Sequence, residues 1–279
     1  MACKVLIAGC GDLGCAVAER LNQEDFEVYG LRYSNKSLPS GVKLIQADVT
    51  QPSSLRSLES LTPEILLYCV AASAQTDESY QAHYVDGLHN VLNFLAPAAS
   101  LKHVFFVSST RVYGQQTDEL LDEASPAIPA DFGGERLLEA EALLKTTGCL
   151  STVLRLSGIY GHGRTRMLRL ARQPEQWPQQ DSWTNRIHRD DAASFIAFLL
   201  ECVRAKQAVQ DCYVVTDSQP VSQYEVLMWL AGQLGVNLNQ IKPPAIKGGK
   251  RLSNRRMLGE GFSLLYPDYR IGYSSLLGD

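Results

Sequence analysis

Short apolar runs alternate with longer amphipathic segments over the first two thirds of the chain. The apolar runs predict strands over residues 4–8, 27–31, 42–46, 65–70, 103–108 and 151–156. They are continuous rather than alternating, which is typical of parallel strands covered on both faces. The segments between them predict helices over residues 11–22, 53–61, 80–99 and 134–147. Repeated strand–helix units require right-handed crossovers, so the pattern predicts an α/β fold, a Rossmann-type doubly wound parallel sheet.

The pattern changes after about residue 160. Residues 173–183 are rich in Gln, Pro and Trp and predict a loop, and residues 212–216 predict another strand. Two further helices are expected, one over 190–203 that Asp190 and Asp191 would cap, and one over 222–234 capped by Ser222. We therefore expect a dinucleotide-binding domain over 1–159, to which 187–211 return, and a small substrate-binding lobe over 160–186 and 212–279.

Composition is that of an ordinary globular protein, with 45% hydrophobic residues and a formal net charge of -4. This charge gives no global attraction to nucleic acid or to an anionic membrane. No apolar run reaches the ~18 residues of a membrane span, and the N-terminus leaves no room for a signal peptide. Seven cysteines without a CxxC pair and five histidines without zinc-ligand spacing favour free thiols and no metal. We expect a cytoplasmic monomer or homodimer with a small-molecule substrate.

The first predicted strand runs into a GxGxxG sequence that opens the first predicted helix. Gly9 would permit a tight turn, Gly11 would let the backbone approach a pyrophosphate, and Gly14 would allow close helix–strand packing. The backbone N–H groups that follow, at Asp12 and Leu13, would bind phosphate oxygens. The sequence therefore predicts a dinucleotide site, and the alternative is a glycine-rich turn without a ligand.

The end of the second predicted strand bears on the choice of cofactor. NAD sites usually have an acidic residue there for the ribose hydroxyls, whereas this chain has Leu31 and Arg32. An arginine can pair with a 2′-phosphate, so NADP is favoured and NAD remains possible. The alternative is that Arg32 is a solvated surface residue. Asp48 and Val49 follow the third strand and would border the adenine.

Four segments of the chain resemble motifs of one protein family and occur along the chain in the order that this family has. Residues 108–114 read SSTRVYG, 154–161 read LRLSGIYG, 185–192 read NRIHRDDA, and 84–92 read YVDGLHNVL. Together with the glycine-rich turn, they resemble the extended short-chain dehydrogenase/reductase superfamily of NAD(P)-dependent epimerases and dehydratases. The resemblance implies further cofactor contacts at Val70, Ala71 and Ala72.

The resemblance also implies a catalytic Ser/Thr–Tyr–Lys set, of which Ser109 would be the hydroxyl that holds a substrate oxygen. The tyrosine and lysine are missing. In one alignment Phe132 and Arg136 take their places, and in the other Gly133 and Leu137 do. Phenylalanine has no proton to exchange, and positioned acid–base catalysis contributes roughly 10²–10⁴ in rate. Arg136 could still bind the ribose as a cation.

Arginines gather in the predicted substrate lobe, and from the resemblance we expect Arg164 and Arg186 to bind substrate. Six basic residues and no carboxylate lie in residues 242–256. Guanidinium groups suit phosphate or carboxylate, so a nucleotide-sugar or another anionic metabolite is expected. The alternative is a solvated basic face.

Three functions are consistent with these features. The first is an NAD(P)-binding oxidoreductase or epimerase/dehydratase-like enzyme acting on a small, anionic, nucleotide-sugar-like substrate. The second is a non-catalytic NADP(H)-binding redox sensor or regulatory protein, which the missing tyrosine favours. The third is a structural subunit that holds NADP permanently.

Overall fold

The computed structural model describes residues 2–96 and 99–277. The chain divides into two compact units. Unit 1 comprises Met1–Gly114, Ile128–Arg155 and Ala193–Tyr213, and unit 2 comprises Gln115–Ala127, Leu156–Ala192 and Val214–Asp279. Residues 115–127 lie in unit 2, although the sequence analysis assigned them to the first domain, because β6 (Leu120–Leu121) pairs with β14 (Arg251–Leu252).

A seven-stranded sheet, counted over the described residues, has the order β11-β7-β5-β4-β1-β2-β3. Its strands are β1 (Cys3–Ala8), β2 (Phe26–Arg32), β3 (Lys43–Gln46), β4 (Ile65–Tyr68), β5 (His103–Ser109), β7 (Leu150–Leu156) and β11 (Cys212–Val215). The pairings from β3 through β2, β1 and β4 to β5 are all parallel. The fully buried β4 explains the unbroken apolar runs, and the predicted Rossmann-type fold class is confirmed.

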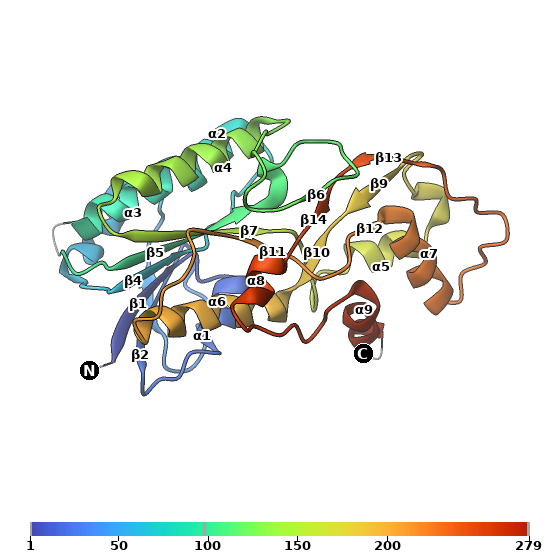
Figure 1. Cartoon of the computed structure of the whole chain (residues 1–279). Helices are drawn as coiled ribbons and strands as arrows, with labels where there is room; N and C mark the ends of the chain where they lie inside the picture. The colour runs from blue at the N-terminus through green and yellow to red at the C-terminus, as the bar shows by residue number, and fades with distance from the viewer. Residues whose placement is uncertain (1, 97–98, 278–279) are drawn as a thin grey trace. The chain divides into compact units, whose positions relative to one another are not determined.

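Helices cover both faces of this sheet (Figure 1). On one face lie α2 (Asp77–Tyr80), α3 (Gly87–Leu95) and α4 (Phe132–Leu143), with the π-helix η2 (Gln81–Asp86) joining the first two. On the other face lie α1 (Asp12–Ala18) and α6 (Arg189–Arg204). This is the layering that repeated strand–helix crossovers require.

Two predicted helices differ in detail. The segment 53–61 forms a 3₁₀ helix, η1 (Pro52–Ser60). The segment 80–99 begins earlier, at Asp77, because the Thr76 side chain accepts a hydrogen bond from the Ser79 N–H and caps α2. It continues to Leu95 in α3, and its predicted positions 97–98 lie outside the described residues.

Unit 2 is built from short elements. Its strands are β8 (Gly158–Tyr160) paired with β10 (Arg186–His188), and β9 (Asp181–Thr184) between β12 (Val221–Ser222) and β13 (Ile246–Gly249). Its helices are α5 (Arg166–Ala171), α7 (Gln223–Gln233), α8 (Arg255–Gly259) and α9 (Tyr269–Leu277). A core with α7 at its centre includes Trp177, Leu227 and Tyr273.

One prediction for unit 2 is confirmed and one is wrong in part. The Ser222 hydroxyl caps α7 by accepting from the Glu225 N–H at 3.1 Å, as predicted. The predicted loop 173–183 contains the start of β9, which pairs with residues 37 to 66 positions further along the chain. Such distant pairing leaves no local signal.

All seven cysteines lie in the described part of the chain and carry free thiols, as expected. Over the same residues, no helix has both the length and the apolar character needed to cross a membrane.

Candidate functional site

The turn between β1 and α1 holds its three glycines in different surroundings. Gly9 has a φ of +89°, and a Cβ on it would lie 2.6 Å from the backbone of Cys69 and Val70. A Cβ on Gly14 would lie 2.7 Å from the Gly9 carbonyl oxygen, so this position holds the helix close to the strand. Over Gly11, no described atom comes nearer to such a Cβ than 3.9 Å. The space above Gly11 is open, as the approach of a pyrophosphate requires.

Arg32 ends β2 beside this turn. The amides of Gly9 and Cys10 both donate to the Leu31 carbonyl at 2.9 Å, which joins the turn to the end of β2. Burial raises the pKa of Cys10 to about 12, and the nearby Arg32 guanidinium opposes that rise. The buried Nε of Arg32 has no hydrogen-bond partner among the described residues. A buried, unpartnered cationic nitrogen is costly, so this atom suits an anionic ligand group.

Other predicted cofactor contacts lie at the same edge of the sheet, where the parallel strands β3 and β4 end. One Asp48 carboxylate oxygen accepts from the Thr50 amide and hydroxyl, at 2.9 and 2.8 Å, and Val49 is buried. Val70 and Ala72 are partly exposed and Ala71 is exposed. Ligands of such sheets bind beyond the carboxyl ends of the strands, so all five residues keep positions compatible with the prediction.

Ser109 ends β5 and begins a short turn, η4 (Thr110–Val112). Its Oγ accepts from the Arg111 amide at 3.2 Å. No described residue accepts the hydroxyl proton of Ser109, which leaves that proton for a ligand. The predicted role of Ser109 therefore stays a prediction that its surroundings permit.

Arg111, which the sequence analysis did not select, is held on two of its three guanidinium nitrogens. Its Nε donates to both carboxylate oxygens of Asp131, at 2.8 and 3.1 Å. Its Nη1 donates to Gln75 Oε1 at 3.0 Å and to the Tyr80 hydroxyl at 2.8 Å. The guanidinium carbon also lies 5.1 Å from the ring of Tyr80 and 5.2 Å from the ring of Phe132. These contacts fix the group in one place.

The residues that could stand in place of the missing tyrosine and lysine lie at the start of α4, and the two possible pairs have different neighbours. Phe132 packs edge-on against Tyr80, with ring centroids 5.5 Å apart. Arg136 forms two hydrogen bonds to Asp77, at 2.7 and 3.0 Å, and a third to Glu139. The Phe132/Arg136 pair therefore faces α2, where both members are already engaged.

The Gly133/Leu137 pair faces another way. Both residues are buried, and a Cβ on Gly133 would lie 2.5 Å from the guanidinium carbon of Arg111. Gly133 thus faces the turn that follows Ser109. Phe132 also lies against this guanidinium, whose carbon is 5.2 Å from its ring centroid, so contact with the turn is common to both alignments and both stay open.

A buried polar network fixes α4 to the sheet. Glu141 accepts from the Ser108 hydroxyl at 2.6 Å and from Nε and Nη2 of Arg155 at 3.1 and 2.6 Å. Arg155 Nη1 donates to the Tyr113 hydroxyl at 2.7 Å. Buried charges persist when they are paired in this way, and the network joins the C-terminal part of α4 to β5, next to Ser109, and to β7.

In unit 2, the two predicted substrate arginines differ in exposure. Arg164 is half-buried beside β8. Arg186 is 6% exposed, donates to Thr184 Oγ1 at 2.6 Å, and lies over the ring of Tyr269. Its Nη1 is buried without a partner among the described residues, as are the Tyr160 hydroxyl and one Asp217 oxygen. Both arginines remain predicted substrate contacts.

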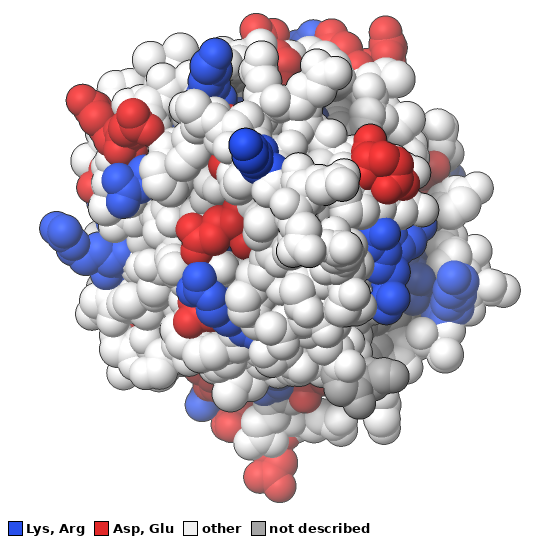
Figure 2. Space-filling model, turned by 90° about the vertical axis from the view of Figure 1, so that its right-hand side faces the viewer, with Lys and Arg blue, Asp and Glu red and all other residues white. Residues whose placement is uncertain are grey.

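The basic stretch of unit 2 is partly engaged within the protein. Arg251 lies 5.0 Å from the ring of Trp183, and Arg256 approaches Glu123 at 3.6 Å. On the face in Figure 2, Lys and Arg side chains are interspersed with Asp and Glu side chains rather than forming one basic surface. These contacts favour the alternative of a mixed, solvated face for this stretch.

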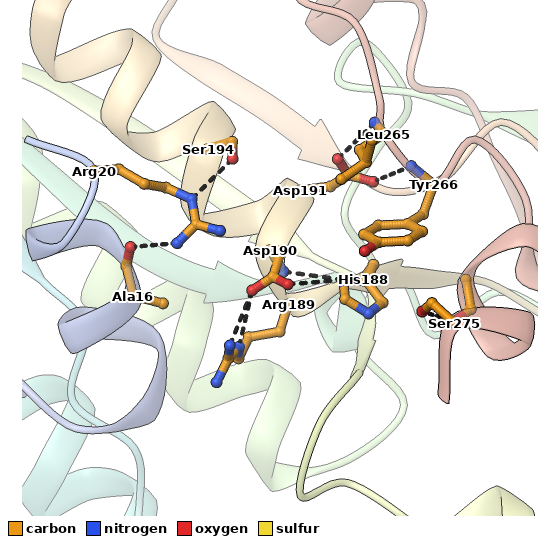
Figure 3. Close-up of polar contacts among 11 residues, drawn as sticks. Ala16, Arg20, His188, Arg189, Asp190, Asp191, Ser194, Leu265, Tyr266 and Ser275 are labelled. Carbon is orange, nitrogen blue, oxygen red and sulfur yellow. Dashed lines mark hydrogen bonds and ion pairs between the residues drawn. The ribbon is translucent and has the colours of Figure 1, made fainter. Parts of the chain in front are cut away.

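Asp190 and Asp191 lie in the first turn of α6, where negative charge opposes the helix dipole. Asp191 also accepts from the amides of Leu265 and Tyr266, both at 2.8 Å, and so holds a distant segment of unit 2 (Figure 3). Asp190 pairs with Arg189 at 3.0 Å. The sequence predicted the position of the two carboxylates but not the anchoring role of Asp191.

Three residues that organise the site were missed in the sequence. Asp131 could have been found, because an aspartate three residues before a helical amide is a common N-cap, and its Oδ1 accepts from the Gly134 amide. Arg111 stands inside the SSTRVYG segment, at a position the motif leaves variable. Tyr80 gave no signal, because only the fold brings it to Arg111.

Comparisons with known protein families and solved structures identify the family of this chain. The chain matches the RmlD substrate binding domain over residues 3–254 and belongs to this family, a member of the extended short-chain dehydrogenase/reductase superfamily. The resemblance of the sequence to this superfamily is thereby confirmed. A protein of known structure from Methylobacillus flagellatus, provisionally described as an NAD-dependent epimerase/dehydratase, is 51% identical. That match covers 100% of this chain and 98% of the other, with a TM-score of 0.91.

More distant relatives carry more specific names. The spore coat polysaccharide biosynthesis protein SpsK of Bacillus subtilis (strain 168) is 24% identical over 184 residues, which cover 62% of this chain and 60% of SpsK. The match thus spans less than two thirds of that relative. The UDP-glucose 4-epimerase of Thermus thermophilus, solved with NAD, is 18% identical over 99% of this chain and 98% of its own, with a TM-score of 0.77. At that identity the likeness shows the fold alone.

Proposed function

We propose that this protein is an NAD(P)-dependent oxidoreductase or epimerase/dehydratase-like enzyme that acts on a sugar nucleotide and prefers NADP. The observation that carries the proposal is the open space above Gly11, in a turn whose other two glycines are tightly packed. The description of the Methylobacillus flagellatus protein as an NAD-dependent epimerase/dehydratase supports the reaction class. The NAD complex of the Thermus thermophilus epimerase and the polysaccharide role in the name of SpsK support the cofactor and substrate classes.

The residues present fit a dinucleotide. The backbone from Gly9 to Gly14 would hold the pyrophosphate, and the unpartnered Nε of Arg32 would meet a 2′-phosphate. Asp48 and Val49 would border the adenine, and residues 70–72 would contact the nicotinamide half. When bound, such a cofactor supplies or accepts a hydride. Ser109 would donate a hydrogen bond from its hydroxyl to the substrate oxygen on the carbon that exchanges the hydride.

Two arginines of unit 2 are the proposed substrate contacts. Arg164 and Arg186 would bind the anionic part of the sugar nucleotide, because guanidinium groups bind phosphate oxygens with two parallel hydrogen bonds. The unpartnered Nη1 of Arg186 supports a ligand or ordered water at that atom. A second candidate function, a sensor of the NADP/NADPH ratio, is favoured by one observation. Neither Phe132 nor Gly133, the two residues that could stand in place of the tyrosine, has a proton to transfer.

Turnover separates the two candidates. The purified protein is incubated with the oxidised or reduced form of NADP or NAD and with UDP-glucose, dTDP-glucose and their 4-keto derivatives. The reduced nicotinamide is followed by its absorbance and the sugar nucleotides by chromatography, because an epimerase or dehydratase regenerates its cofactor. If the protein is an enzyme, we expect turnover, and we expect Ser109→Ala to lower its rate about tenfold or more without changing the affinity for the cofactor. Ser60→Ala, which removes an exposed hydroxyl bonded to the Ser57 carbonyl, is the matched control. Cofactor binding with no turnover of any compound would instead support the sensor.

A further inference from the structure

The guanidinium of Arg111 occupies a space that only a glycine at position 133 leaves free. A Cβ on Gly133 would lie 2.5 Å from its carbon and 2.7 Å from both Nε and Nη1. Real side chains essentially never approach that closely, so any larger residue at 133 would displace the arginine. The arginine and the glycine therefore form one structural unit, in which the cation stands over the start of α4.

The hydrogen bonds of the guanidinium show which nitrogen is left for a ligand. A Cβ on Gly133 would lie over the flat face of the group, nearest to its carbon, so the start of α4 covers one face and leaves the N–H donors in the plane of the group. Nε is occupied by Asp131, and Nη1 by Gln75 and Tyr80. Among the described residues, no acceptor bonds to Nη2. The arginine thus presents one amino group with two unused N–H donors, and its side chain is 29% exposed.

Arg111 and Ser109 belong to the same turn, because the Arg111 amide donates to Ser109 Oγ at 3.2 Å. We propose that Nη2 of Arg111 and the hydroxyl of Ser109 together bind the substrate oxygen on which negative charge develops when a hydride is added. The inference rests on the proposed function. It assigns a catalytic role to Arg111 in a site that has lost its tyrosine.

The step balances without a protein acid. In the reductive direction, a bound reduced cofactor would supply a hydride to the carbonyl carbon of the substrate, and the π electrons of the C=O bond would move to the oxygen. The resulting alkoxide is bound by the two N–H donors of Nη2 and by the Ser109 hydroxyl, and water supplies its proton. In the reverse direction the alcohol gives its proton to water and its hydride to the oxidised nicotinamide.

An arginine can stabilise this charge but cannot supply the proton. Burial lowers the pKa of Arg111, and the bond to Asp131 outweighs this effect and raises the pKa above its ordinary value. The group therefore stays cationic throughout the pH range in which proteins are folded. Fixed donors aimed at a developing oxyanion are worth about 10²–10³ in kcat.

The first experiment tests the arginine–glycine unit without any substrate. Gly133→Ala is combined with Arg111→Ala in a double-mutant cycle, and stability is measured by denaturant unfolding. We expect Gly133→Ala to destabilise the wild type more than it destabilises Arg111→Ala. Gly134→Ala is the matched control, because its Cβ would meet the Arg111 backbone and Pro129, which Arg111→Ala leaves in place. Equal costs of Gly133→Ala in both backgrounds would overturn the proposal.

The second experiment tests the catalytic role with the 4-keto sugar nucleotides made from UDP-glucose and dTDP-glucose. We expect Arg111→Met to lower kcat about 10²–10³-fold with a smaller change in KM. Arg111→Lys should keep part of the rate, and added guanidinium ion should restore part of it to Arg111→Ala. Arg204→Met is the control, because Arg204 also pairs with carboxylates and lies over a ring, but at the start of β2.

The outcomes separate the inference from the proposed function. An active wild type with an equally active Arg111→Met variant would overturn the inference alone. The same holds if neither lysine nor guanidinium ion restores any rate, because the arginine would then be structural. A wild type that turns over no member of the panel would overturn the proposed function and this inference with it.

Discussion

Two glycines in unit 1 occupy comparable places in the fold and have opposite surroundings. Gly11 lies between β1 and α1, and nothing among the described residues comes within 3.9 Å of a Cβ built on it. Gly133 lies in the first turn of α4, and a Cβ there would meet the Arg111 guanidinium at 2.5 Å. The first glycine keeps a space open, whereas the second makes room for a side chain of the protein.

The surroundings of each glycine decide whether its missing side chain leaves room for a ligand or for the protein itself. At Gly11 the missing side chain leaves room for a ligand, because the surrounding backbone keeps the space empty. At Gly133 the missing side chain is compensated inside the protein, so the position carries no ligand space of its own. The open turn is therefore where we propose that the cofactor binds, whereas the start of α4 accommodates the Arg111 guanidinium.

The largest effect is expected at the open glycine. Gly11→Val would put a branched side chain into the space that the pyrophosphate needs, so NADPH should no longer bind detectably in a fluorescence titration. The fold should survive, since no neighbouring atom is close enough to clash. Gly232→Val, at another glycine whose Cβ would meet nothing within 4 Å, is the control for the side chain itself. Unchanged NADPH affinity would remove the turn from the cofactor site.

Buried polar groups in the two units differ in whether they have hydrogen-bond partners within the protein. In unit 1, Glu141 and Arg155 are bonded to each other and to Ser108 and Tyr113. In unit 2, the Tyr160 hydroxyl, Arg186 Nη1 and one Asp217 oxygen are buried without a partner among the described residues. The paired network should resist changes of pH, while the unpaired groups should respond to them.

The second effect concerns the paired network. Glu141→Ala would leave Arg155 as an uncompensated buried charge, which costs about 3–5 kcal/mol. The measurement is the free energy of unfolding in denaturant. Glu139→Ala is the matched control on the same helix, because its ion pair with Arg136 is exposed and should contribute less than about 1 kcal/mol. Equal losses in the two variants would show that the network does not anchor α4.

The third effect is a pH dependence. Burial raises the pKa of Asp217 from 3.8 to about 7, opposed by Arg186 and supported by the nearby carboxylates of Asp268 and Asp191. The folded state then holds a proton between about pH 4 and 7 that the unfolded state has lost. Stability should therefore fall as pH rises through that window. Asp217→Asn should remove this slope.

A buried histidine in unit 1 should give the opposite dependence of stability on pH. Burial lowers the pKa of His103 from 6.5 to about 4, so its contribution to stability is lost as pH falls through that range. Unfolding curves of the wild type, Asp217→Asn and His103→Asn across this range measure both slopes. A wild type and an Asp217→Asn variant with parallel pH profiles would contradict the assignment to Asp217.

The parts predicted well from the sequence are those with a local physical cause. The continuous apolar run of β4 and the turn from Gly9 to Gly14 follow from strand burial and from backbone sterics, which neighbouring residues determine. The cap at Ser222 is equally local, because its partner lies three residues away. Such features need no knowledge of the rest of the fold.

The parts that were missed depend on residues distant in the chain. Arg111 meets Gln75, Tyr80 and Asp131, which lie 36, 31 and 20 positions away. Nothing near position 111 distinguishes a fixed guanidinium from a solvated one. Likewise, the two alignments at the start of α4 differ by one residue, and both Phe132 and Gly133 lie against the Arg111 guanidinium, a contact that only the fold creates.

The smallest effect is expected at Arg32, where the open turn meets a cation. A charge-assisted hydrogen bond to a 2′-phosphate is worth roughly 1.5–3 kcal/mol, or about ten- to a hundredfold in affinity. We therefore expect the wild type to bind NADP more tightly than NAD. Arg32→Ala should remove most of that preference by weakening NADP, with little change for NAD.

The structure also shows where an acid must be placed to reverse the preference. Leu31 is 1% exposed, so an aspartate there would be buried and would destabilise the sheet. Arg32→Asp instead puts a carboxylate at the partly exposed end of β2, where it would accept from the ribose hydroxyls of NAD and repel a 2′-phosphate. This variant should prefer NAD.

Calorimetry at fixed salt gives the two dissociation constants, since screening weakens exposed charge pairs. Lys36→Ala is the control, because Lys36 is an exposed cation four residues further along and should contribute less than the buried Nε of Arg32. Some preference for NADP surviving in Arg32→Ala and vanishing in the double variant would show that both cations share the phosphate. Equal wild-type affinities, or tighter NAD, would mean that Arg32 has no part in the choice of cofactor.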